Sequence, residues 1–193
     1  MKSIKKEITN EIIINKSKFI TIITPFSTLD NFNTYLNNIK KTYPNATHYC
    51  YGYIINNHEK CSDNGEPSGT AGNPILNVLK QNDLKNILCV VIRYFGGIKL
   101  GAGGLIRAYS TSASEALNKC EIINLTKGYE ITYEFDYNNI KKINYLLKNI
   151  NIKKTFENKI IYEFKINENE LKKIENELNL LGKIKNKRSI MTF

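Results

Sequence analysis

The glycine-rich stretch FGGIKLGAGG, residues 95–104, combines a bare backbone with positive charge. It follows an apolar run, ILCVVI (87–92), that predicts a strand buried on both faces, and it precedes a segment with helical spacing from about Ala102 to Cys120. Glycines at such a turn leave N–H groups uncovered where the helix begins, and the helix dipole favours an anion there. We therefore expect anion or nucleic-acid binding by this stretch and its flanks, namely by Arg93, Gly96, Gly97, Lys99, Gly101, Gly103, Gly104 and Arg107.

The stretch matches neither of the two common glycine-rich phosphate motifs. The P-loop pattern GxxxxGK[ST] is absent, and Ile106 stands where the third glycine of a dinucleotide fingerprint is required. A second interpretation is that the glycines only allow the strand to pack tightly against the helix. Both interpretations remain open from the sequence.

The segment CSDNGEPSGTAG, residues 61–72, is rich in residue types that favour turns and predicts a functional loop. Two of its carboxylates, Asp63 and Glu66, are candidate general acid/base groups or ligands for a hard cation. The more ordinary interpretation is that Asp63 and Ser68 cap turns while Glu66 pairs with a lysine or with Arg93. We expect the loop to face the site through Ser62, Asp63, Glu66, Ser68 and Thr70.

His48 is the third candidate catalytic residue. It shares one face of an alternating strand, 46–55, with Cys50. Together with Cys61 these two residues could supply three zinc ligands, but the fourth ligand is missing. We therefore predict no metal and no cofactor. The ordinary interpretation of His48 is a strand histidine hydrogen-bonded to a loop, such as the glycine-rich one. The opposite face of the strand could stack nucleobases or belong to the core through Tyr49, Tyr51 and Tyr53.

The composition is that of a globular, basic protein. The chain has 193 residues, 41% of them hydrophobic, and its net charge is 28 − 18 = +10, which favours polyanions. Lysine and asparagine are abundant throughout whereas arginine occurs three times, so that part of the charge reflects compositional bias. No apolar run has the roughly 18 residues that span a bilayer, and four cysteines lack a CxxC pair. We expect a cytoplasmic protein with reduced thiols and no membrane partner.

The elements that must position these residues form a first domain, residues 1–126. A hairpin is expected over 12–24, with its turn in INKSK, and Ser27 is expected to cap a helix whose apolar positions are Leu29, Phe32, Leu36 and Ile39. The strand 46–55 follows, and a short helix from about Pro74 to Lys80 leads from the acidic loop to the strand 87–92.

A second domain is expected over residues 128–193, where glycine becomes rare. Alternating and helical patterns predict strands at 129–135, 153–156, 160–166 and 184–193, with helices marked by Ile140 to Ile150 and Leu171 to Leu181. The order βαββαβ is the ferredoxin-like split βαβ pattern. The fold class is therefore α+β in two domains.

Four segments together resemble the signature blocks of the YigZ/IMPACT family: EIIINKSKFI (11–20), ATHYCYGY (46–53), SDNGEPSGTAGNPIL (62–76) and RYFGGIKLGAGGLIRAYS (93–110). The resemblance covers essentially the whole chain. It implies an N-terminal IMPACT domain, an α+β sandwich similar to the second domain of a small-subunit ribosomal protein and to GHMP kinases. It also implies a ferredoxin-like C-terminal domain similar to the last domain of elongation factor G.

The resemblance also implies a function. Eukaryotic members act in translational control by competing for the activator of an amino-acid-starvation kinase, and a nucleic-acid-binding role is implied for the two-domain bacterial form. Asn64 stands where the family usually has a second aspartate, which removes a carboxylate from the acidic loop and lowers the expectation of metal catalysis.

The leading hypothesis is a noncatalytic, translation-linked regulator. It would bind RNA, the ribosome or a translation-associated protein through Arg93, Lys99 and Arg107, with the second domain as a further contact. One alternative is an enzyme acting on a small phosphorylated or carboxylated ligand held between the 62–72 and 94–104 loops, with His48, Asp63 or Glu66 as acid/base. Another is a protein-interaction module.

Overall fold

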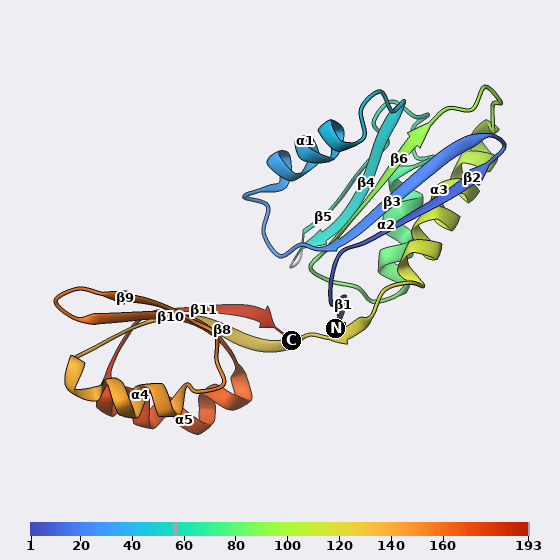
Figure 1. Ribbon diagram of the computed structural model, residues 1–193. Helices are drawn as coiled ribbons and strands as arrows, with labels where there is room; N and C mark the ends of the chain where they lie inside the picture. The colour runs from blue at the N-terminus through green and yellow to red at the C-terminus, as the bar shows by residue number, and fades with distance from the viewer. Residues whose placement is uncertain (56–57, 193) are drawn as a thin grey trace. The chain divides into compact units, whose positions relative to one another are not determined.

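The computed structural model describes residues 1–55 and 58–192, which form two compact units, Met1–Ile123 and Asn124–Phe193 (Figure 1). Both units combine helices with antiparallel sheets, which confirms the predicted α+β class. The division lies a few residues before the boundary predicted at 126–128. Each unit contains a hydrophobic core of its own.

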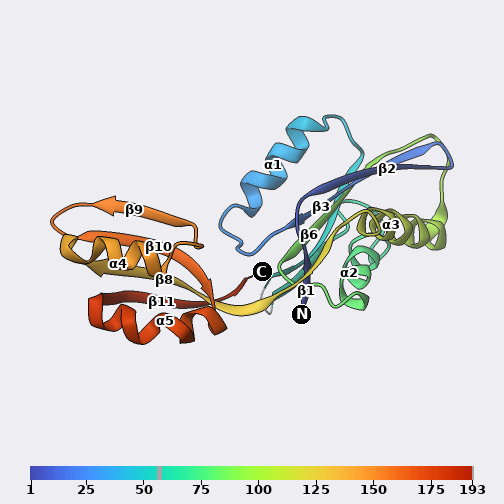
Figure 2. The same ribbon diagram turned by 60° about the horizontal axis from the view of Figure 1, so that its bottom comes forward.

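Unit 1 is built on a five-stranded antiparallel sheet. In spatial order its strands are β2 (Ile8–Ile14), β3 (Ser17–Pro25), β6 (Ile87–Tyr94), β4 (His48–Ile55) and β5 (His58–Ser62). One face is covered by α2 (Gly72–Gln81) and α3 (Gly101–Leu117), and the other by α1 (Phe32–Thr42), as Figures 1 and 2 show. A short strand β1 (Lys2–Ile4) pairs with β7 (Ile122–Asn124).

The central strand β6 explains the continuous apolar run. Its residues alternate between the two layers, with Cys89 and Val91 in the core beneath α2 and α3, and Val90 and Ile92 in the core beneath α1. The alternation places Arg93 on the same side as Val91. This register brings a charged side chain into the layer that contains α3.

In unit 1 one local expectation was wrong and one strand was not predicted. Helix α1 begins at Phe32 rather than near Ser27, because Thr28 and Asp30 bond to each other through side chain and backbone, an arrangement that competes with helix formation. Strand β5 was not expected, because its sequence HEKCS is polar and its residues are largely exposed at the sheet edge. The hairpin β2–β3, β4, α2 and α3 lie where they were predicted, although α3 ends at Leu117.

Unit 2 has the predicted ferredoxin-like order. Its elements are β8 (Thr126–Phe135), a 3-10 turn (Tyr137–Asn139), α4 (Ile140–Leu146), β9 (Ile152–Phe156), β10 (Ile160–Asn167), α5 (Glu168–Leu181) and β11 (Gly182–Thr192). The sheet order is β11-β8-β10-β9, with antiparallel neighbours, and both helices lie on one face (Figure 1). The core of unit 2 contains four buried aromatic side chains, Tyr133, Phe135, Tyr162 and Phe164.

Candidate functional site

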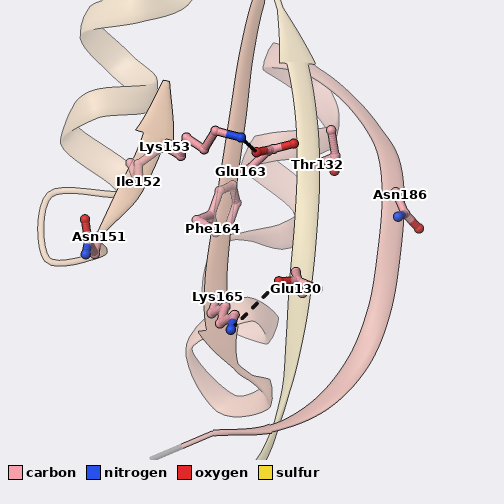
Figure 3. A pocket seen from close by; sticks show the side chains of 9 residues that line it. All are labelled: Glu130, Thr132, Asn151, Ile152, Lys153, Glu163, Phe164, Lys165 and Asn186. Carbon is pink, nitrogen blue, oxygen red and sulfur yellow. Dashed lines mark hydrogen bonds and ion pairs between the residues drawn. The ribbon is translucent and has the colours of Figure 1, made fainter. Parts of the chain in front are cut away.

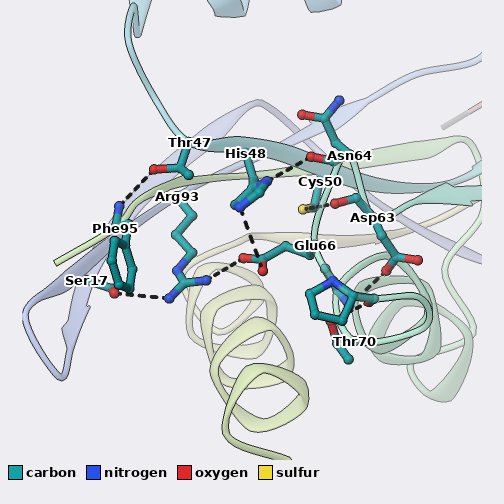
Figure 4. Close-up of polar contacts among 12 residues, drawn as sticks. Ser17, Thr47, His48, Cys50, Asp63, Asn64, Glu66, Thr70, Arg93 and Phe95 are labelled. Carbon is teal, nitrogen blue, oxygen red and sulfur yellow. Dashed lines mark hydrogen bonds and ion pairs between the residues drawn. The ribbon is translucent and has the colours of Figure 1, made fainter. Parts of the chain in front are cut away.

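Glu66 anchors the acidic loop in the interior of unit 1, with a side chain only 4% exposed. Its Oε1 accepts hydrogen bonds from Arg93 Nη1 at 2.6 Å and from the Tyr109 hydroxyl at 2.8 Å. Its Oε2 lies 3.8 Å from Nε2 of His48 (Figure 4). These partners come from β6, α3 and β4, so that one carboxylate ties the loop to three elements.

Arg93 is buried, and both terminal nitrogens of its guanidinium donate hydrogen bonds. Nη2 donates to Ser17 Oγ at 3.3 Å, and the guanidinium carbon lies 5.4 Å from the ring centres of both Phe19 and Phe95. Among the described residues Nε has no hydrogen-bond partner. The pairing with Glu66 is the ordinary alternative that the sequence left open. This burial removes Arg93 from the cations that could meet a phosphate on the surface.

Asp63 shapes the loop itself. Its two oxygens accept hydrogen bonds from the backbone N–H groups of Gly69, Ala71 and Gly72 at 2.8–2.9 Å, which bends the loop onto the start of α2. Burial acts to raise the pKa of this carboxyl, but the three backbone donors outweigh it and hold the pKa below its usual range. Asp63 and Glu66 therefore serve different partners, which argues against a shared acid/base pair.

The remaining loop residues make local contacts. Thr70 Oγ1 donates to the Pro67 carbonyl at 2.6 Å, and Ser62 Oγ accepts from the Asn64 backbone at 3.3 Å. Ser68 is exposed. These bonds support the predicted turn chemistry of the segment.

His48 contacts the acidic loop rather than the glycine-rich stretch. Its Nδ1 lies 2.9 Å from the Asn64 carbonyl oxygen, and because a carbonyl only accepts, this bond assigns the proton to Nδ1. The ordinary interpretation, a strand histidine hydrogen-bonded to a loop, is therefore confirmed, although the partner is the acidic loop and not the glycine-rich one given as an example. His48 therefore holds the acidic loop through Nδ1, and its Nε2 faces the carboxylate of Glu66.

Cys50 lies beside His48 on β4 and is not an activated nucleophile. Its thiol donates to the Asp63 carbonyl at 2.9 Å and lies 3.3 Å from the Tyr109 hydroxyl. Burial raises the pKa of this thiol to about 12, and burial likewise raises the pKa of Tyr109. A thiol with so high a pKa is neutral at physiological pH and therefore unreactive. Among the described residues no cluster of three His, Cys, Asp or Glu side chains could hold a metal.

The glycines of the stretch 95–104 have different reasons to be glycine. A Cβ at Gly96 would collide with the backbone of Lys16 and Ser17, where the stretch crosses the β2–β3 turn. Gly97 and Gly101 have φ angles of +84° and +69°, which favour glycine. Gly104 would bring a Cβ to 3.1 Å from the Leu100 Cβ. Packing and backbone conformation thus account for most of the stretch.

Gly103 is the exception. Its φ is outside the left-handed region, and a Cβ there would meet nothing nearer than Arg107 Nη1, at 3.8 Å. The first turn of α3 has no side-chain cap and no acidic residue. Lys99 and Arg107 are exposed, and among the described residues neither is paired with a carboxylate. Bare N–H groups and two cations therefore share one surface, the α3-start surface, which we define as residues 97–107.

Unit 2 contains a hollow of about 730 Å³ on its sheet (Figure 3), where Lys153 meets Glu163 at 2.8 Å and Lys165 meets Glu130 at 3.9 Å. These ion pairs balance much of the charge in the hollow. Its lining consists of Glu130, Thr132, Asn151, Ile152, Lys153, Glu163, Phe164, Lys165 and Asn186.

Sequence reasoning missed Tyr109 and Ser17 as members of the Glu66 network. Tyr109 lies on the predicted buried stripe of its helix, and a buried tyrosine hydroxyl needs a polar partner, which was a usable signal. Ser17 had no comparable signal, because its role depends on the crossing of two loops.

The fold and site define a two-unit α+β protein with a buried Glu–Arg network beside an exposed glycine-rich helix start. The family model described as Impact N-terminal domain matches residues 15–117. The chain is 43% identical over 165 residues to IMPACT family member YvyE of Bacillus subtilis, covering 80% of this chain and 76% of that protein. It is 33% identical over 139 residues to IMPACT family member YigZ of Escherichia coli, covering 69% and 68%.

A solved structure described as a hypothetical protein aligns with a TM-score of 0.69 and 26% identity, over 92% of this chain and 90% of that one. The chain belongs to the IMPACT family, as the four sequence blocks predicted. In the described part of the chain no helix is both long and apolar enough to cross a membrane.

Proposed function

We propose that this protein is a noncatalytic, translation-linked regulator that acts in the cytoplasm and binds RNA, free or within the ribosome, through the α3-start surface. The link to translation is supported by the family to which the chain belongs. The mode of binding is supported by the geometry of unit 1.

Gly103 carries the proposal. A glycine inside a helix costs roughly 0.5–1 kcal/mol relative to alanine. At Gly103 neither a positive φ nor a close neighbour offsets that cost. A bare backbone at an uncapped helix start does have a use, because a phosphate can approach the free N–H groups closely.

The charges around Gly103 have the sign that a phosphate requires. Arg107 reaches back along α3 toward Gly103, and Lys99 stands two residues before the helix begins. The net charge of +10 adds a long-range attraction for polyanions. Arg93 contributes indirectly, since its pairing with Glu66 positions the stretch on the sheet.

The experiment measures the affinity for a fluorescent structured RNA at several salt concentrations. Each phosphate contact contributes about 0.7–0.9 to the slope of log affinity against log salt. In Lys99→Ala/Arg107→Ala we expect weaker binding and a slope smaller by about 1.4–1.8. The matched control is Lys41→Ala/Lys60→Ala, which removes the same charge from exposed positions on α1 and β5.

Gly103→Ala separates the two interpretations of the glycines. If Gly103 serves packing alone, the alanine leaves RNA affinity unchanged. If the bare backbone meets a phosphate, the alanine weakens binding while the protein remains folded. Equal losses in both double variants, or no affinity for RNA at low salt, would contradict the proposal.

A second candidate function is favoured by the contact between the two loops. The Glu66–Arg93 pair joins the 62–72 loop to the strand end from which the 94–104 loop starts. An enzyme acting on a small phosphorylated or carboxylated ligand would use this junction, with His48 or Glu66 as acid/base. A ligand-induced rise in melting temperature, with turnover lost in a Glu66→Gln protein that is still folded, would favour it over RNA binding. A protein partner retained after nuclease treatment would instead favour an interaction module.

A further inference from the structure

Phe95 is an aromatic residue at the surface whose flanking backbone is held by hydrogen bonds. The residue is 47% exposed although its ring contacts the buried Arg93. Its backbone N–H donates to Thr47 Oγ1 at 3.0 Å (Figure 4). The N–H of Gly96 donates to Ser17 Oγ at 3.2 Å. The backbone on either side of the ring is therefore anchored to β3 and to the start of β4.

The ring has one supported face. The Arg93 guanidinium lies over it, 5.4 Å from the ring centre, and is itself held by Glu66 and Ser17. Because the cation covers one face of the ring, the exposed surface of the ring lies away from that face. With this contact on one face and hydrogen bonds holding the flanking backbone, the ring has fewer conformations to lose on binding than a side chain without such contacts.

The surroundings of Phe95 combine apolar surface with positive charge. Ile98 and Ile106, at the two ends of the α3-start surface, are each 43% exposed. Lys99 follows Ile98 in the sequence and Arg107 follows Ile106, and both cations are exposed. A ligand that matches this surface needs both a flat apolar part and a negative part.

We propose that Phe95 is a stacking platform for an unpaired nucleobase, so that the protein binds single-stranded rather than duplex nucleic acid. This inference rests on the proposed function and names its substrate class. A base offers a flat face to the ring, and its flanking phosphates meet Lys99, Arg107 and the bare start of α3. Bases inside a duplex are already stacked on one another and cannot supply that face.

The test compares four oligonucleotides of one length: an unstructured RNA, the same strand with abasic positions, the blunt duplex, and the single-stranded DNA of the same sequence. The variants are Phe95→Leu, which keeps an apolar side chain, and Phe95→Tyr, which keeps the aromatic ring. The control for lost apolar surface is Leu29→Ala, at a residue that is 42% exposed and lies outside the α3-start surface. Melting temperatures establish that each variant is folded.

We expect Phe95→Leu to weaken binding of the unstructured RNA by about 5- to 150-fold, the range for loss of one base stack. Phe95→Tyr retains most of the affinity. The abasic strand and the duplex bind more weakly than the unstructured RNA and respond little to Phe95→Leu. The DNA arm separates the two sources of unpaired bases, since equal Phe95 dependence on DNA supports stacking without recognition of the 2′-hydroxyl.

Two results overturn the inference and are distinguishable from each other. If Lys99→Ala/Arg107→Ala weakens RNA binding but Phe95→Leu has no effect, or the same effect on the abasic strand, stacking is excluded while the proposed function stands. If no nucleic acid binds at low salt, the proposed function and the stacking role fail together.

Discussion

Replacing Asp63 with asparagine tests how far the acidic loop depends on one carboxylate. Oδ1 accepts from the N–H groups of Ala71 and Gly72, and Oδ2 accepts from that of Gly69. Asparagine has the same size, but only one of its two terminal atoms accepts hydrogen bonds. In Asp63→Asn the amide NH₂ must therefore face at least one backbone donor.

The size of the effect follows from these contacts. A hydrogen bond to a charged group contributes about 1.5–3 kcal/mol, and a carboxylate at a helix start, here that of α2, about 0.3–1 kcal/mol more. Loss of the bond to Gly69 and of the charge predicts that the free energy of unfolding of unit 1 falls by about 2–4 kcal/mol.

The pH dependence provides a second readout. The backbone donors hold the pKa of Asp63 below its usual range. A carboxyl whose folded pKa lies below its unfolded value of about 3.9 stabilises the fold above that value, and this contribution is lost as the pH falls through the folded pKa. Wild-type unit 1 therefore loses stability below about pH 4. Asp63→Asn shows a smaller loss over the same range, because asparagine does not titrate.

Hydrogen exchange at residues 69–72, together with urea unfolding, measures both effects. The matched control is Asp136→Asn, whose carboxylate is 67% exposed and lies 3.9 Å from Lys159. We expect that control to change stability by no more than about 0.5 kcal/mol. Native protection of residues 69–72 in Asp63→Asn at neutral pH, with an unchanged urea midpoint, would refute the role assigned to the carboxylate.

Two further predictions concern Glu66 in the acidic loop and two glycines of the glycine-rich stretch. Glu66→Gln keeps an oxygen that can accept hydrogen bonds from Arg93 and Tyr109, but it removes the charge that balances the buried guanidinium. We expect the free energy of unfolding measured in urea to fall by about 3–5 kcal/mol, and to be partly recovered in Glu66→Gln/Arg93→Met. A double variant no more stable than Glu66→Gln would contradict this. Gly96→Ala places a methyl group against the backbone of Lys16 and costs about 1–3 kcal/mol, whereas Gly103→Ala, in open space, leaves the melting temperature equal or higher.

The fold was predictable where one periodicity dominated a segment. The strand 87–92 and the helix after it follow from the apolar run and from the 3.6-residue spacing that puts Leu105 and Tyr109 in the core. β5 was not predictable in this way, because an exposed edge strand needs no apolar face and its sequence carries no alternation. The start of α1 was misplaced because a local Thr28–Asp30 turn is as compatible with the sequence as a helix cap.

The candidate site was predictable only in part, because residue types indicate chemistry but not direction. Alternation along β6 puts Arg93 on the α3 side, yet a charge is tolerated there only because Glu66 arrives from a loop 27 residues earlier. The sequence offered Glu66 several partners, and only the fold selects among them. The partners of Asp63 likewise depend on a loop conformation that no periodicity encodes.

Arg93 connects the interior of unit 1 with its surface. A buried ion pair is weak support for stability, because desolvation offsets much of the attraction between its charges. The pair matters here because of what the guanidinium of Arg93 contacts. It pairs with Glu66, lies over the ring of Phe95 and donates a hydrogen bond to Ser17. Ser17 also accepts a hydrogen bond from the N–H of Gly96. The burial of Arg93 therefore fixes the start of the glycine-rich stretch relative to the acidic loop. The RNA-binding role proposed for the α3-start surface depends on that fixed geometry more than on another exposed cation.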